Sequence, residues 1–179
     1  MRGSQICCAC FRAGEGVFSS TTTGRQDRQA AAAVLLVSAA LALVLGTAVY
    51  LLDRSWSSVL FLAPLAGWQQ GSMGLFGRIA DSLPSLTHAY AFALLVIVAL
   101  WPWRRARLAG ALSWLVVACG LECLQAPAFR ALLAPADRAS GGPFLDFMMN
   151  GRFDAVDIAA TAAGVLAAYA VSSVLEKQQ

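Results

Sequence analysis

The chain has 179 residues, of which 59% are hydrophobic and 13% are charged, and its formal net charge is +3. A soluble domain carries about 25% charged and about 45–50% apolar residues, so this composition excludes an ordinary water-soluble domain. No basic run is interleaved with aromatic residues, which argues against a nucleic-acid partner. A chain of this length makes one domain, and we expect an all-α membrane protein whose apolar surface is partly covered by lipid.

The first 29 residues are polar and carry more arginines than acids. We expect residues 1–29 to form a disordered cytosolic tail, and no signal peptide opens the chain because the first apolar run begins near residue 30. Cys7, Cys8 and Cys10 crowd into this tail without a histidine or a second cluster, a spacing that does not predict a zinc site. Metal binding or acylation of the tail is the less favoured alternative, and we expect no cofactor.

Residues 30–52 form the first apolar run, which holds no charged residue. A run of about 23 residues spans a bilayer core of about 30 Å, so we expect a transmembrane helix here. A cleaved signal peptide is less favoured, because the run is too long for one. The alanines and Gly46 permit close packing against a neighbouring helix.

The segment 53–82 is ambiguous. Val59–Trp68 is apolar but contains Pro64, and about ten residues are too few to span a bilayer. Trp56 and Trp68 suit the headgroup level of the membrane, where amphipathic rings settle. We therefore expect an interfacial or re-entrant segment, and the alternative is a fifth crossing.

Two further apolar runs predict an antiparallel helical hairpin. We expect transmembrane helices at 83–103 and 108–125, joined by a short basic linker. Tryptophans at the end of the first of these runs mark the membrane interface. Cys119 and Cys123 lie one helical turn apart, and we interpret them as small buried apolar residues, not as a redox pair.

The long loop 126–154 contains a segment, Pro127–Ala134, that we expect to form a short interfacial helix. The fourth transmembrane helix is expected at 156–175, followed by a short polar end at 176–179. Small residues recur along this helix at four-residue spacing, a stripe that lets membrane helices approach closely. The members of the stripe are Ala160, Gly164 and Ala168.

The arginines concentrate in the tail and in the linker at 104–107. With four crossings, both basic segments lie on the same side of the membrane, and the positive-inside rule makes that side cytoplasmic. Five crossings would place one of the two segments outside. We therefore expect a small polytopic bundle of four transmembrane helices over residues 30–175, with both termini in the cytoplasm.

Each of the last three apolar runs carries an ionisable residue: His88, Glu122 and Asp157. In this topology all three lie within about one and a half helical turns of the outer surface. A carboxylate costs about 2.5–3.5 kcal/mol at the centre of a membrane helix and less near the interface, so it needs a partner or a wet cavity. We expect the three side chains to meet at one outward-facing polar site, although each one alone is more simply explained by snorkelling or capping.

Four further residues extend this candidate site. Gln125 shares a helix face with Glu122, three positions earlier. Arg152, in the outer loop, is a candidate counter-ion for the acids. Asp154 and Thr161 are expected to support the site, and the alternative role of Asp154 is to cap the last helix. We expect no metal ligands among these residues.

The residues just described occur in a recognisable order. His88 is followed by aromatic residues, then come Glu122-Cys-Leu-Gln125 and Gly151-Arg152-Phe153-Asp154-x-x-Asp157, running to Gly164. This pattern resembles the VanZ-like family of bacterial membrane proteins, related to a teicoplanin-resistance protein, over about residues 83–169. The family's Asp-Lys pair before the histidine is replaced here by Pro84 and Ser85, and its asparagine one turn after the last aspartate by Thr161. The chain therefore resembles a divergent member.

The resemblance implies a multi-pass protein of the bacterial inner membrane with no settled biochemical activity. The namesake of the family is associated with low-level resistance to the glycopeptide teicoplanin, without a change in the peptidoglycan stem. Chemistry that depends on the family's lysine is not expected here, because that lysine is absent.

Several functions are compatible with the pattern. We favour a binding protein whose pocket of His88, Glu122, Gln125, Arg152 and Asp157 holds or shields the polar part of a membrane lipid or lipid-linked envelope molecule; the arginine would suit a phosphate. The alternative is a structural or assembly subunit, in which the polar set only keeps the helices in register. A membrane enzyme is less favoured, since the chain holds no HExxH, nucleophile-elbow or P-loop motif. A transporter is less favoured too, because no internal repeat is evident.

Overall fold

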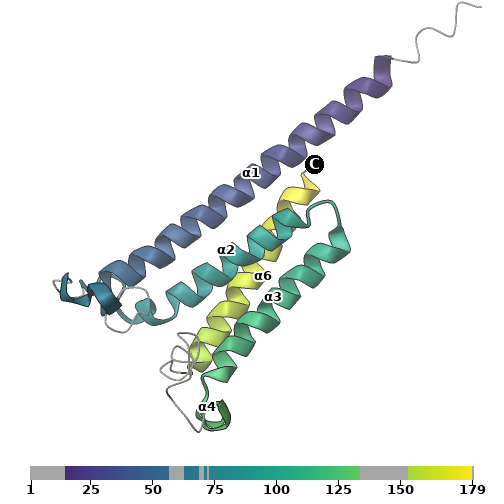
Figure 1. Cartoon of the computed structure of the whole chain (residues 1–179). Coiled ribbons are helices and arrows are strands. Elements are labelled where there is room, and N and C mark those ends of the chain that lie inside the picture. Colours follow the sequence, from purple (N-terminus) through teal and green to yellow (C-terminus); the bar gives the residue numbers. More distant parts are fainter. Residues whose placement is uncertain (1–14, 57–62, 69–70, 72, 134–152, 179) are drawn as a thin grey trace, which may run out of the picture.

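The computed structural model describes residues 15–56, 63–68, 71, 73–133 and 153–178, and these residues form helices and connecting turns (Figure 1). The four long helices are α1 (Glu15–Leu52), α2 (Leu83–Ala99), α3 (Arg104–Leu124) and α6 (Ala155–Lys177). Shorter elements lie between them. These are the 3₁₀ helices η2 (Ala63–Trp68) and η3 (Gly77–Asp81) and the short helix α4 (Pro127–Leu133).

Helix α2 is the central element of the bundle. It contacts α1, α3 and α6, and its buried side chains include Ala91, Leu94 and Ile97. The helix contains no charged residue and is apolar on all its faces, as expected of a helix with neighbours on several sides. Its alanines let the neighbouring helices approach closely.

The faces of α1, α3 and α6 that point away from α2 are apolar and exposed. Leu41, Val116 and Leu166 are 66%, 71% and 66% exposed, respectively. The three helices are also long and apolar enough to cross a membrane. Apolar surface of this extent on long helices is the surface that lipid covers, so the chain is a helical membrane protein. Helix α2 has 17 residues and falls short of that length, and its crossing stays a prediction.

The helix bounds differ from the expected ones most at the start of α1, the end of α2 and the start of α3. Helix α1 begins at Glu15, so the second half of the polar N-terminal segment is helical, because extending an existing helix needs no new nucleus. Residues 1–14, with the three clustered cysteines, lie outside the described residues. Helix α2 ends at Ala99, since Pro102 has no backbone N–H and disfavours helical geometry in the residue before it. Helix α3 then begins directly at Arg104.

The segment after α1 folds back onto the end of that helix. The Asp53 carboxylate accepts hydrogen bonds from the backbone N–H groups of Leu75 and Phe76, each at 2.6 Å. The backbone N–H of Met73 donates to the carbonyl oxygen of Leu52 at 2.7 Å. Within the described part of 53–82 only the two 3₁₀ helices occur, of six and five residues, so no described helix there has membrane length.

Two glycines let the outer helices touch α2. A Cβ atom added to Gly46 of α1 would lie 2.5 Å from Oγ1 of Thr87 and 3.0 Å from Cε1 of His88. A Cβ atom added to Gly164 of α6 would collide with the carbonyl oxygen of Leu86. Gly164 and Ala168 of the predicted small-residue stripe are buried in this contact.

Candidate functional site

Chain direction alternates through the bundle, and this brings four helix ends together. The C-terminal ends of α1 and α3 and the N-terminal ends of α2 and α6 lie toward the lower left of the molecule in Figure 1. The ionisable residues expected from the sequence belong to these ends. His88, Glu122 and Asp157 therefore lie at a similar depth in the bundle.

The acids of α3 and α6 come together at this end. Glu122 is close enough to Asp157 and Asp154 for their charges to interact, although it lies on a different helix. Arg54, two residues beyond α1, is also within electrostatic range of Glu122 and Asp157. Glu122 and Asp157 are both partly buried. The segment after α1, the end of α3 and the start of α6 thus supply charges to one region, which we call the acidic end and define by Arg54, Glu122, Asp154 and Asp157.

Asp157 is held against α2. Its carboxylate interacts with the hydroxyl groups of Ser85 and Ser82. Its Oδ1 atom is enclosed and has no hydrogen-bond partner among the described residues. Asp154 has a separate structural role, since its side chain accepts a hydrogen bond from the backbone N–H of Val156 at 2.9 Å and caps α6. The capping interpretation of Asp154 therefore holds.

His88 faces α1 and not the pair of acids. Its Nδ1 atom lies 2.7 Å from the carbonyl oxygen of Pro84, and its ring meets the ring of Tyr50 edge-on, with centroids 5.9 Å apart. A carbonyl oxygen only accepts, so Nδ1 carries the proton of this hydrogen bond. The structure therefore places His88 on the α1 side of α2, beside Gly46, while Ser85 faces Asp157.

Tyr50 and Arg54 lie between His88 and the acids, and neither was among the site residues expected from the sequence. The guanidinium carbon of Arg54 lies 5.3 Å from the centroid of the Tyr50 ring, and Arg54 also donates to the carbonyl oxygen of Asp81. Tyr50 is within electrostatic range of Asp157 and Glu122. One signal was present in the sequence: a basic residue follows the first apolar run at the expected outer end, where the positive-inside rule disfavours it.

The remaining candidates have different positions. Gln125 follows the last residue of α3 and is buried, as is Thr161, one turn beyond Asp157 in α6. Both lie in packed surroundings close to the acidic end. Arg152, expected as the counter-ion, lies outside the described residues. Among the side chains that the structure describes, Arg54 is the cation that interacts with both acids.

Among the described residues, the hydroxyl groups of Ser82 and Ser85 and the phenol of Tyr50 lie near the carboxylates and the Arg54 guanidinium of the acidic end. Carboxylates accept hydrogen bonds from hydroxyl or ammonium groups, and a guanidinium donates to a phosphate or carboxylate. Within the described ranges, no three His, Cys, Asp or Glu side chains gather closely enough to ligate a metal ion. The carboxylates and the guanidinium can recognise a polar group that carries hydrogen-bond donors, an anion, or both.

A cavity of about 300 Å³ lies at the opposite end of the bundle, not at the acidic end. It is formed by α1, α3, α6 and the turn between α2 and α3. Its lining residues are Asp27, Arg28, Trp101, Pro102, Arg104, Arg107 and Glu176. In the sequence, the arginines of this region indicated only the orientation of the chain in the membrane.

Comparison with known proteins returns no match: no family model, no curated protein and no solved structure is similar to this chain.

Proposed function

We propose that the chain is a divergent VanZ-like protein that crosses the inner membrane four times, with α2 as the fourth crossing. The 17 residues of α2 extend about 25 Å at 1.5 Å per residue. Ser82 and the turn at 100–103 lengthen that path toward the bilayer thickness of about 30 Å. An even number of crossings keeps the basic N-terminal segment and the arginines at the start of α3 on one side, which the positive-inside rule makes cytoplasmic.

The acidic end then faces outward, and its proposed function is to bind or shield the polar part of an envelope lipid or lipid-linked molecule. The observation that carries this proposal is the meeting of Glu122 and Asp157 with Arg54, from three separate parts of the chain. These side chains are only partly buried, so a headgroup at the membrane surface can reach them. Hydroxyl or amine groups of such a molecule would satisfy the acids, while Arg54 would contact its phosphate.

A structural role is the second candidate, and particular contacts favour it. Asp157 interacts with hydroxyl groups of α2, and Asp154 caps α6. Gly46 and Gly164 already bring α1 and α6 into close contact with α2. In this alternative, the polar residues only fix the register of the four helices.

The binding role and the structural role predict different effects when an acid is replaced by the neutral amide of the same shape. If the acidic end binds a headgroup, Glu122→Gln and Asp157→Asn each weaken binding by about 10- to 150-fold, because each removes a charge-assisted hydrogen bond worth about 1.5–3 kcal/mol. The measurement is native mass spectrometry of the purified protein titrated with a polyprenyl-phosphate-linked envelope precursor. Asp81→Asn is the matched control, since Asp81 is an exposed acid at the same end of the bundle.

Membrane abundance of the same variants separates the candidates. In the binding role, both variants accumulate as the unaltered protein does, and any teicoplanin tolerance conferred by the protein is lost. In the structural role, abundance itself falls and the precursor does not restore it. Unchanged binding by both variants would contradict the proposed binding function.

A further inference from the structure

The cavity at the end opposite the acidic end is independent of the proposed function. It lies where the apolar part of α1 begins, where α2 turns into α3, and where α6 ends. These three places meet at the end of the bundle where α3 begins and α6 ends, and both of these helices are long and apolar enough to cross a membrane. Trp101 lines the cavity, and tryptophan settles at the headgroup level of a bilayer.

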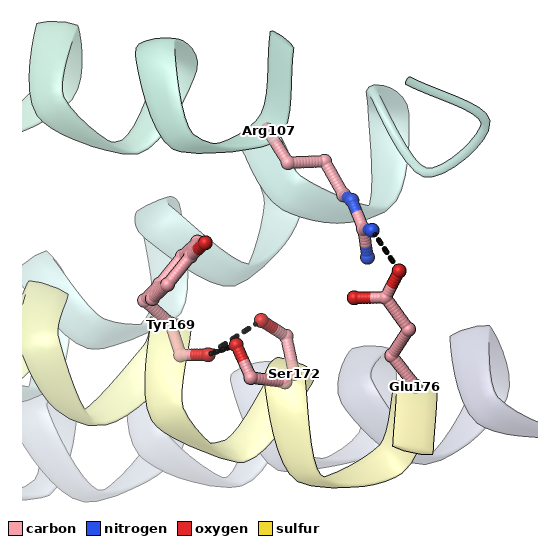
Figure 2. A network of polar contacts seen from close by, with 5 residues as sticks. Arg107, Tyr169, Ser172 and Glu176 are labelled. Atoms are coloured by element: carbon pink, nitrogen blue, oxygen red, sulfur yellow. Dashed lines mark hydrogen bonds and ion pairs between the residues drawn. The ribbon is translucent and has the colours of Figure 1, made fainter. Parts of the chain in front are cut away.

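Arg107 is the most buried charged residue of this cavity wall. Its side chain is 6% exposed, and it donates to the Glu176 carboxylate at 2.7 Å (Figure 2). Its guanidinium carbon also lies 4.7 Å from the centroid of the Trp101 ring. The Nε atom is enclosed and has no hydrogen-bond partner among the described residues. The Arg107 side chain therefore adds a buried positive charge to the wall of the cavity, beside the Trp101 ring.

Figure 2 also shows two hydrogen bonds within α6, close to the C-terminal end of that helix. The hydroxyl groups of Ser172 and Ser173 both donate to the carbonyl oxygen of Tyr169, at 2.8 Å each. Glu176, one turn further along α6, is the carboxylate that reaches Arg107.

The N-terminal end of α3 also lacks a group that would balance its positive charge. Trp103 precedes the helix and makes no side-chain cap, and the first turn contains no acid. Instead it carries Arg104, Arg105 and Arg107, although positive charge is unfavourable at the N-terminal end of a helix dipole. A bound anion would accept hydrogen bonds from the free backbone N–H groups and offset the clustered positive charge.

We propose that this cavity binds a phosphate group, supplied by the headgroup of an anionic membrane phospholipid. Three arginines line it against Asp27 and Glu176, so its formal charge is positive. A volume of about 300 Å³ lies at the lower limit of small-molecule sites, which suits a headgroup whose acyl chains stay in the surrounding lipid. The lipid would lie against α1, α3 and α6 and connect them at the basic side of the bundle.

The test uses the purified full-length protein in detergent and native mass spectrometry. Phosphatidylglycerol is titrated against phosphatidylcholine, which carries the same phosphate but no net charge. The expected result is one saturable site that prefers phosphatidylglycerol. Arg104→Gln and Arg28→Gln should each weaken this binding by about tenfold, since each removes a charge-assisted contact. Both arginines are exposed, so the fold should tolerate these substitutions.

Arg105→Gln is the matched control, because Arg105 is equally exposed and adjacent in sequence but does not line the cavity. Its effect should stay well below that of Arg104→Gln. Equal losses for these two variants would indicate attraction to the basic surface in general and would overturn the proposal, as would equal binding of the two lipids.

Competition with inorganic phosphate shows whether the cavity binds the headgroup of a lipid or free phosphate. If millimolar phosphate leaves the bound phosphatidylglycerol in place, the ligand is the lipid headgroup. If phosphate displaces the lipid and its own binding is weakened by Arg104→Gln, the cavity recognises free phosphate by the same contacts. If neither phosphate nor lipid responds to Arg104→Gln, the cavity is not a phosphate site.

Discussion

Gly164→Ala is expected to lower the free energy of unfolding by about 1–3 kcal/mol, the usual cost of overpacking a close contact. The added Cβ atom would collide with the carbonyl oxygen of Leu86 and would lie 3.0 Å from the backbone nitrogen of Tyr90. Both atoms belong to the backbone of α2 and cannot move aside as the end of a side chain can. The measurement is unfolding of the purified protein in mixed micelles by added sodium dodecyl sulfate.

Gly120→Ala provides the control, with an effect of opposite sign. Nothing lies within 4 Å of a Cβ atom at Gly120, in α3. Replacing a glycine by alanine inside a helix then stabilises it by about 0.5–1 kcal/mol, because the unfolded chain loses freedom. If both substitutions change stability in the same direction, the close contact of α6 with α2 at Gly164 is wrong.

The ion pair between Arg107 and Glu176 should respond unequally to loss of its two partners. Glu176→Gln leaves the guanidinium of Arg107, whose side chain is 6% exposed, without its carboxylate. Such an uncompensated buried charge costs about 3–5 kcal/mol. Arg107→Met leaves Glu176, whose side chain is 37% exposed and can be hydrated, so the expected cost is smaller, about 1.5–3 kcal/mol.

The double variant Arg107→Met with Glu176→Met tests whether the unpaired guanidinium causes the loss of stability. Removing both charges avoids the stranded guanidinium, so this variant should be more stable than Glu176→Gln alone. Thermal unfolding in detergent measures all three variants. Equal costs for the two single substitutions would show that Arg107 is better hydrated than its burial implies.

The helices themselves were predictable because a bilayer restricts the choice of structure. Backbone groups in lipid must be satisfied within the segment, so long apolar runs form helices. The expected runs at 108–125 and 156–175 correspond to α3 and α6, and the short helix after Pro127 occurs as α4. The start of α1 at Glu15 was not predictable, since a polar segment can extend an existing helix with no change in its apolar pattern.

The partners of each side chain were harder to predict than its depth. Spacing along a helix indicates which residues share a face, but not which neighbour that face meets. His88 therefore lies against Tyr50 of α1, whereas Glu122 and Asp157 meet each other. Arg107 and Glu176 are separated by 69 positions. In the sequence, Arg107 is one of the arginines that indicate orientation and Glu176 belongs to a short polar end, so nothing indicates that the two pair.

Cysteine cross-linking across the acidic end tests the central claim, that α3 and α6 bring Glu122 and Asp157 together. The five native cysteines are replaced by serine, and Glu122→Cys and Asp157→Cys are combined in the full-length protein within native membranes. A short bifunctional thiol reagent should then join the two helices within one chain. Val116→Cys with Asp157→Cys should not react, because Val116 is 71% exposed on the outer face of α3. No cross-link in the first pair, or equal cross-linking in both, would contradict the account.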